Sequence, residues 1–194
     1  MDRIPQDSRE TPLQRLGGPG LTLPNALTVL RILLVPFFIG TLSYGYYGYS
    51  LVIFAAAGVT DLFDGLLARI KNQKTSFGAL LDPVADKALL VSSFITLAIL
   101  GWMPKWLAII VISRDVILIA GNLSIYIITG ALEVSPSLLG KLTTAFQIIL
   151  IALTLFIMNF GSNSIPMSIF LWLTGILTVL SGLHYIFEGF KSVS

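Results

Sequence analysis

Four aspartates stand close together in a chain that has few charged residues. They are Asp61, Asp64, Asp82 and Asp86, and the whole sequence of 194 residues contains only ten acidic residues. An ionised carboxylate in or near hydrocarbon costs free energy unless it is paired or binds a metal ion. Carboxylate oxygens suit Mg²⁺ or Mn²⁺ better than zinc, which prefers histidine and cysteine. The pattern therefore predicts a site for hard divalent cations.

The spacing of these residues indicates two helices joined by a short loop. Over residues 61–68, the first two aspartates, Gly65 and Ala68 follow helical spacing and share one face. In the second half, Gly78 and the other two aspartates recur at intervals of four and line a second helical face. The intervening segment, 70–77, is polar enough to be a loop. Such a hairpin would bring two carboxylates from each helix to one place.

Composition indicates an integral membrane protein. The chain is 55% hydrophobic, with a mean hydropathy of +0.88, and only 11% of its residues are charged. A soluble domain normally carries about twice that charged fraction. There is no cysteine and only one histidine, His184, which excludes disulfides, thiolate metal sites and a histidine cluster.

We expect an all-α integral membrane fold with six transmembrane helices and no soluble domain, since each span needs about 20 residues. The predicted spans are separated by polar, glycine- or proline-containing turns such as 101–105. They cover residues 24–42, 50–68, 83–100, 106–128, 142–160 and 165–187. Residues 1–21 lack the pattern of a signal peptide and are predicted to be a cytoplasmic tail, followed by a six-helix domain over 22–190.

The distribution of basic residues predicts the orientation in the membrane. One side would hold Lys105 alone, whereas the other would hold most of the remaining basic residues. These are Arg3, Arg9, Arg15, Arg69, Lys71, Lys74, Lys141 and Lys191. The positive-inside rule then places both termini in the cytoplasm. The aspartates would lie at the cytoplasmic ends of the second and third spans, with Arg31 at a similar depth, around a polar cavity that faces the cytoplasm.

The stretch that contains the aspartates resembles the signature of the CDP-alcohol phosphatidyltransferase family. The matching pattern is Asp61-x-x-Asp64-Gly65-x-x-Ala68-Arg69, then eight residues, then Gly78-x-x-x-Asp82-x-x-x-Asp86. Members are dimeric six-helix membrane enzymes that transfer a phosphatidyl or related group from a CDP-linked donor to an alcohol. The resemblance implies a homodimer in the lipid bilayer and CDP-diacylglycerol as donor. The compact size of the chain favours a bacterial inner (cytoplasmic) membrane as its location, with an organelle of bacterial ancestry as the alternative.

The resemblance also implies roles for the aspartates. Asp61, Asp64 and Asp82 would be ligands of two divalent ions, Mg²⁺ or Mn²⁺, and Asp86 would lie close to the second ion. Asp82 and Asp86 are the candidate catalytic residues. Asp86 would act as the general base that takes the proton from the acceptor hydroxyl. The reaction would be a direct displacement, because no cysteine or well-placed histidine offers a covalent route.

The remaining signature residues are expected to bind the donor. Gly65 and Gly78 lack side chains, and Ala68 is small, so the cytidine or the pyrophosphate could approach the backbone closely. Arg69 offers a planar fork of donors to a phosphate. Outside the signature, Arg31, Arg114 and Lys141 are candidate contacts for a charged acceptor.

Two segments bear on the identity of the acceptor. Residues 23–31 and 136–147 are similar to the corresponding parts of phosphatidylglycerophosphate synthases and cardiolipin synthases. The former tend to carry a second arginine eight positions after the arginine of the fourth span, where this chain has Asn122. We expect glycerol 3-phosphate as the acceptor, with phosphatidylglycerol, the acceptor of cardiolipin synthases, as the alternative. Because adjacent helical residues do not face each other, Arg114 is expected not to pair with Asp115.

Other classes of protein remain open at this stage. Acidic residues inside a membrane are also typical of a small ion-coupled transporter. A non-catalytic membrane scaffold could retain the same motif. Lys87, which directly follows Asp86, is expected to balance local charge or to extend toward the interface. No nucleic-acid partner is expected.

Overall fold

The computed structural model describes residues 23–71, 76–129, 138–161 and 166–193. Within these ranges it describes the side chains of residues 29–60, 87–121, 138–161 and 166–187. The described residues form an all-α fold of six helices. Their bounds are α1 (Leu23–Ser43), α2 (Tyr47–Lys71), α3 (Ser76–Ile99), α4 (Lys105–Thr129), α5 (Leu138–Phe160) and α6 (Met167–Val193).

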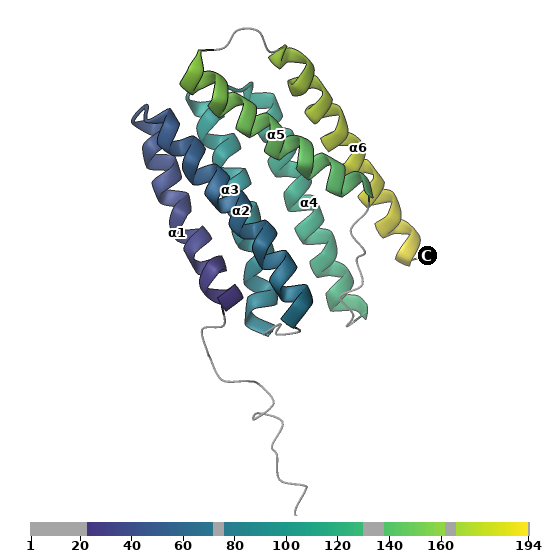
Figure 1. Ribbon diagram of the computed structural model, residues 1–194. Coiled ribbons are helices and arrows are strands. Elements are labelled where there is room, and N and C mark those ends of the chain that lie inside the picture. Colours follow the sequence, from purple (N-terminus) through teal and green to yellow (C-terminus); the bar gives the residue numbers. More distant parts are fainter. Residues whose placement is uncertain (1–22, 72–75, 130–137, 162–165, 194) are drawn as a thin grey trace, which may run out of the picture.

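Successive helices run in opposite directions through the bundle (Figure 1). Helix α1 packs against α2 and α3, while α6 packs against α4 and α5. The end of α2 and the beginning of α3 lie at the same end of the bundle (Figure 1). The predicted helical hairpin is therefore present, and it brings the two halves of the aspartate motif to one end.

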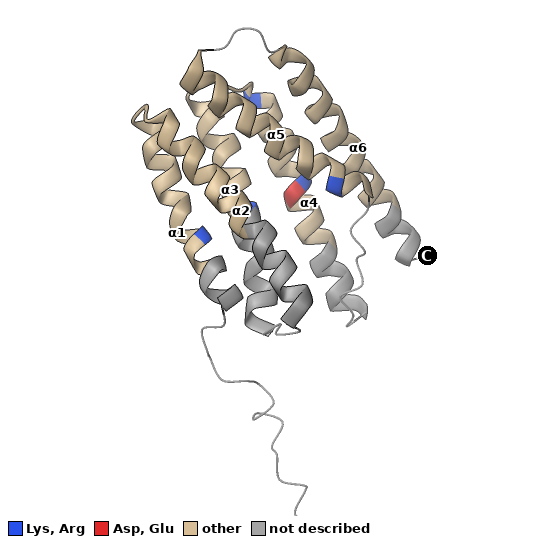
Figure 2. Ribbon diagram, viewed as in Figure 1, with Lys and Arg blue, Asp and Glu red and all other residues tan. Residues whose placement is uncertain are grey.

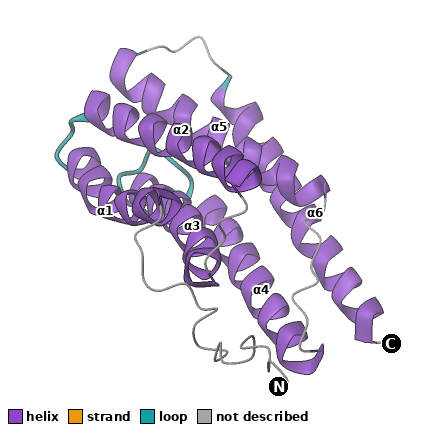
Figure 3. Cartoon of the chain, turned by 60° about the horizontal axis from the view of Figure 1, so that its bottom comes forward, coloured by secondary structure: helices purple, strands orange, loops and turns teal. Residues whose placement is uncertain are grey.

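Glycines with positive φ close the helices at the opposite end. After α3, Gly101 has a φ of 80°, its N–H donates to the Ala98 carbonyl at 3.3 Å, and the Trp102 N–H donates to the Leu97 carbonyl at 3.0 Å. This is the Schellman arrangement, which needs a left-handed residue and favours glycine. Gly45, with a φ of 82°, ends α1 in the same way. The short connections that follow α1 and α3 are drawn as loops in Figure 3.

The apolar core is built by α1 to α5. Its buried side chains are Phe38, Leu42, Phe54, Ala57, Leu89, Leu90, Phe94, Leu97, Ala98, Met103, Leu107, Ala108, Val111, Leu150, Ile151, Leu155 and Met158. Helix α6 packs partly buried apolar side chains on this core and also contributes fully buried hydroxyl groups, because Thr174, Thr178 and Ser181 are all 0% exposed. The interior is therefore mainly apolar, with a row of buried hydroxyl groups on α6.

Many large apolar side chains lie on the outside of the bundle. Val52, Phe37 and Ile99, for example, are 66%, 65% and 75% exposed. Extensive exposed apolar surface is typical of a protein that faces lipid. Among the described residues, Leu138–Phe160 and Met167–Phe187 are long and apolar enough to cross a membrane. An apolar exterior around a partly polar interior thus agrees with association with a membrane.

Each predicted span corresponds to one helix, and several helices extend beyond the predicted apolar span. The third predicted span began at residue 83, whereas α3 begins at Ser76 and Pro83 lies inside it. Helix α5 likewise begins at Leu138, and α6 extends to Val193. The prediction followed hydropathy, and hydropathy marks where the chain becomes apolar rather than where the helix begins. The helical spacing of Gly78, Asp82 and Asp86 did predict most of the polar beginning of α3, whereas no such pattern marked the first residues of α5 or the last residues of α6.

Candidate functional site

The structure places the predicted motif on two helices. Asp61, Asp64, Gly65, Ala68 and Arg69 belong to α2, and Gly78, Asp82 and Asp86 belong to α3. The side chains of all eight lie outside the described residues, as do the predicted N-terminal tail and the side chain of Asn122. Their predicted roles as metal ligands, as catalytic groups and in donor binding stay predictions.

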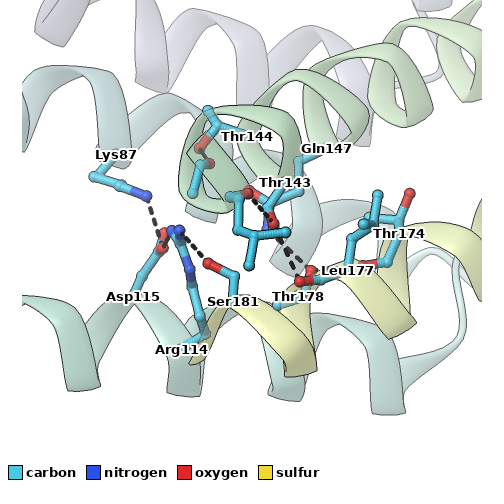
Figure 4. A network of polar contacts seen from close by, with 12 residues as sticks. Lys87, Arg114, Asp115, Thr143, Thr144, Gln147, Thr174, Leu177, Thr178 and Ser181 are labelled. Atoms are coloured by element: carbon cyan, nitrogen blue, oxygen red, sulfur yellow. Dashed lines mark hydrogen bonds and ion pairs between the residues drawn. The ribbon is translucent and has the colours of Figure 1, made fainter. Parts of the chain in front are cut away.

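A charged cluster lies directly beside this motif, where α3, α4 and α6 meet (Figure 4). It consists of Lys87, Arg114, Asp115 and Ser181. Lys87 Nζ lies 2.6 Å from Asp115 Oδ1, and Arg114 Nη1 donates to the same oxygen at 2.8 Å. Arg114 Nη2 also donates to Ser181 Oγ at 3.0 Å. The cluster therefore links three helices through one carboxylate and one guanidinium group.

The charged cluster has more positive than negative charge. Asp115 is the single acid among the described side chains (Figure 2), and it faces two cations. The side chains of Arg114 and Asp115 are only 5% and 4% exposed. Arg114 Nε and Asp115 Oδ2 are buried and have no hydrogen-bond partner among the side chains and backbone that the structure describes. The guanidinium group of Arg114 therefore keeps one buried N–H that can donate to a further acceptor, such as an oxygen of an anionic ligand.

The pairing of Arg114 with Asp115 corrects an expectation. Sequence reasoning held that these neighbours would not face each other, but they form an ion pair with a 2.8 Å contact. The rule concerns the directions of the Cα–Cβ bonds. The arginine side chain is long enough to turn its guanidinium group back toward the adjacent carboxylate. Lys87 does balance local charge, as expected, and the acid that it balances is Asp115 of another helix.

A row of polar side chains between α5 and α6 continues from the charged cluster (Figure 4). Gln147 Nε2 donates to Thr178 Oγ1 at 3.3 Å, and Thr143 Oγ1 donates to the Leu177 carbonyl at 3.1 Å. Gln147 Oε1 is buried without a hydrogen-bond partner. Sequence reasoning missed the α6 side of this row. The sequence pattern that could have predicted it is the helical spacing of Thr174, Thr178 and Ser181 within an otherwise apolar segment.

Two further residues that were predicted to contact the acceptor, Arg31 and Lys141, lie on other helices than Arg114. Arg31 is 3% exposed and belongs to α1, which packs on α2 and α3. Helix α3 lies between α1 and α4 in two views (Figures 1 and 3), so Arg31 and Arg114 belong to helices on opposite sides of α3. Lys141 is exposed near the beginning of α5. Contact of all three with one acceptor stays a prediction.

The donor set of the motif fits a hard divalent cation. Four carboxylates on α2 and α3 supply oxygen ligands of the kind that Mg²⁺ and Mn²⁺ prefer. Across the side chains that the structure describes, there is no other group of three or more His, Cys, Asp or Glu residues that could hold a metal ion. The motif is thus the candidate metal centre.

Gly182 provides a test of packing against the charged cluster. A Cβ at Gly182 would lie 3.6 Å from Arg114 Cγ, which is ordinary van der Waals contact. Gly182→Ala should therefore be tolerated, whereas Gly182→Leu should displace Arg114 and cost about 1–3 kcal/mol of stability. Thermal unfolding in detergent measures the difference. Gly121→Leu is the matched control, because a Cβ at Gly121 has nothing within 4 Å. Equal losses at both positions would contradict this packing.

Comparison with known proteins adds independent findings. The sequence model of the CDP-alcohol phosphatidyltransferase family matches residues 21–180. This range includes the whole aspartate motif and three of the four residues of the charged cluster, while Ser181 lies one position beyond it.

Similar curated proteins carry two kinds of name. A protein of Mycobacterium tuberculosis named "Probable phosphatidylglycerophosphate synthase" is 34% identical, over 88% of this chain and 83% of its own length. A Bacillus subtilis protein named "CDP-diacylglycerol--glycerol-3-phosphate 3-phosphatidyltransferase" is also 34% identical, over 88% of this chain and 96% of its own. A human protein named "Cardiolipin synthase (CMP-forming)" is 33% identical, over 89% of this chain and 63% of its own.

Proposed function

This chain belongs to the CDP-alcohol phosphatidyltransferase family, and we propose that it transfers the phosphatidyl group of CDP-diacylglycerol to glycerol 3-phosphate and releases CMP. The product would be phosphatidylglycerophosphate. The alternative acceptor is phosphatidylglycerol, as the names of the cardiolipin synthase relatives suggest.

The observation that carries the choice of acceptor is the excess positive charge of the charged cluster. Lys87 and Arg114 face the single carboxylate of Asp115 in a largely buried position. A phosphate monoester such as glycerol 3-phosphate carries more negative charge than the phosphodiester of phosphatidylglycerol. Two cations that face one carboxylate, among the described side chains, support the more highly charged monoester as the acceptor. The names of the M. tuberculosis and B. subtilis relatives support the same choice.

The proposed reaction is a single displacement at the phosphatidyl phosphorus. The acceptor hydroxyl oxygen forms the new bond to phosphorus, and the bond to the bridging oxygen breaks, so that CMP leaves with the electron pair. Asp86 takes the proton of the hydroxyl. Gly65, Ala68, Arg69 and Gly78 would hold the cytidine and the pyrophosphate. Arg114, together with Arg31 and Lys141, would hold the acceptor phosphate.

Divalent ions fit this proposal through the chemistry of the four carboxylates. Asp61, Asp64, Asp82 and Asp86 would hold two ions, Mg²⁺ or Mn²⁺. When bound, such ions neutralise the pyrophosphate and stabilise the charge of the leaving CMP. The protein's own contribution would be to keep the four oxygen donors together at the end of the bundle where α2 ends and α3 begins.

The setting of the enzyme is also part of the proposal. All six helices would span the inner membrane of a bacterium, with the termini, the polar cavity and the site on the cytoplasmic side. The exposed apolar surface and the two clearly apolar helices support membrane spanning. The sequence would divide into a tail over 1–21 and a catalytic domain over 22–190 that acts as a homodimer.

Release of CMP by the purified protein in detergent tests this function. We expect CMP from CDP-diacylglycerol when glycerol 3-phosphate and Mg²⁺ or Mn²⁺ are present, and little with phosphatidylglycerol as the sole acceptor. Removal of the metal with EDTA should abolish release, and Mn²⁺ or Mg²⁺ should restore it. Each acceptor is supplied alone, and the lipid product is identified by mass.

Other results of the CMP-release assay would favour the other candidate functions. Release with phosphatidylglycerol alone would make the chain a cardiolipin synthase. No release with either acceptor, by a protein that still binds the metal, would contradict the transferase. A small ion-coupled transporter or a scaffold that retains the motif would then explain the carboxylates better.

A further inference from the structure

Asp115 and Lys87 form a contact between α3 and α4, and neither residue is among those proposed to bind the metal ions or to touch the substrates. Lys87 directly follows Asp86, the last aspartate of the motif, and its ammonium group lies 2.6 Å from Asp115 Oδ1 of α4. The Lys87 side chain is 27% exposed and that of Asp115 is 4% exposed. We propose that Asp115 is a positioning residue that, through Lys87, fixes the rotation of α3 and thereby the placement of the metal-binding aspartates. This inference rests on the proposed metal-dependent function.

Helix geometry connects the ion pair to the motif. Successive residues of an α-helix are about 100° apart around its axis, so positions 86 and 87 turn together. Positions 82 and 86 lie on one face of α3, and Lys87 lies one step around from them. Any rotation of α3 that separated Lys87 from Asp115 would turn the aspartate face by the same angle.

The far side of this contact is itself held in place. Asp115 Oδ1 also accepts a hydrogen bond from Arg114 Nη1 at 2.8 Å, and Arg114 Nη2 donates to Ser181 Oγ at 3.0 Å (Figure 4). Asp115 is therefore anchored to its own helix and, through Arg114, to α6. Because Arg114 holds the buried carboxylate of Asp115 in place, this carboxylate can orient Lys87. Separating Lys87 from it would cost free energy, since a buried charge would lose one of its partners.

Metal affinity distinguishes positioning from a simple effect of charge. By charge alone, Lys87→Met removes a cation near the metal centre and should tighten Mn²⁺ binding, while Asp115→Asn removes an anion and should weaken it. If the pair positions α3, both changes should weaken Mn²⁺ binding, each by about 10-fold. The double variant should then bind Mn²⁺ as tightly as the weaker-binding single variant, because both substitutions break the same ion pair.

The experiment titrates the detergent-purified full chain with Mn²⁺ and follows free Mn²⁺ by electron paramagnetic resonance, without substrates or turnover. Lys87→Arg should recover most of the affinity, since it restores the ion pair. Lys105→Met, which removes a cation at the beginning of α4, is the matched control and should leave the affinity unchanged. If Asp115→Asn does not fold, Lys87→Met decides the question, because that side chain is partly exposed and methionine keeps its stem.

The outcomes separate this inference from the function on which it rests. Weaker Mn²⁺ binding in both single variants supports the positioning role. Tighter or unchanged binding in Lys87→Met overturns it, as would the absence of Mn²⁺ binding by the unmodified protein. The proposed function fails on a different readout, namely the absence of CMP release by the unmodified protein.

Discussion

Asp86→Asn should lower kcat for CMP release by at least about 100-fold, because a positioned general base contributes about 10²–10⁴-fold. Asparagine has nearly the same shape as aspartate, but it cannot accept the proton of the acceptor hydroxyl and it lacks the charge that binds a divalent ion. The measurement is steady-state CMP release at saturating donor and acceptor. Near-normal turnover would remove Asp86 from the mechanism.

The control for this substitution is Asp7→Asn, which makes the same chemical change outside the motif. Thermal unfolding without metal should be similar in Asp86→Asn, Asp7→Asn and the unmodified protein. A large fall in the unfolding temperature of Asp86→Asn alone would assign its loss of activity to folding. Comparison of the Mn²⁺ concentration dependence of turnover separates a loss of the base from a loss of a metal ligand.

The helices could be predicted from the sequence because their signals are local. Apolar stretches of suitable length were separated by turn residues such as Gly45 and Gly101, whose positive φ confirms why glycine is needed there. The positions of the helix ends were less predictable. Ser76, the first residue of α3, lies in a polar segment where hydropathy carries no information about helix formation.

The charged cluster could not be predicted in the same way, because it depends on how the helices are rotated against each other. Lys87 and Asp115 are 28 positions apart in the sequence, and Arg114 and Ser181 are 67 apart. No local pattern states which of these side chains will meet. The hydroxyl face of α6 was different, since Thr174, Thr178 and Ser181 have helical spacing that sequence analysis could have used.

The aspartate motif illustrates a third case, in which chemistry is easier to predict than geometry. Four carboxylates in an apolar chain favour hard divalent ions whatever their exact arrangement. The structure adds that both halves of the motif lie on helices whose adjoining ends meet at one end of the bundle (Figure 1). It also adds the contact between Lys87, next to the motif, and Asp115 of α4, which sequence analysis did not predict.

Arg114→Ala should raise the KM for glycerol 3-phosphate much more than the KM for CDP-diacylglycerol. A hydrogen bond to a charged group contributes about 1.5–3 kcal/mol, which corresponds to roughly a 10- to 150-fold change in affinity. The structure also gives Arg114 a structural role, since it is 4% exposed and holds both Asp115 and Ser181. A control must therefore separate contact with the acceptor from support of the bundle.

Ser181→Ala provides that control, because it removes the 3.0 Å hydrogen bond between Arg114 and α6 while leaving the guanidinium group in place. If Arg114 contacts the acceptor, Ser181→Ala should change the KM for glycerol 3-phosphate far less than Arg114→Ala does. The KM for glycerol 3-phosphate of Arg114→Lys should lie between the values of Ser181→Ala and Arg114→Ala, since lysine keeps the charge but loses the planar fork of donors. Equal effects of Arg114→Ala on both substrates would count against acceptor contact and leave Arg114 as a support for Asp115.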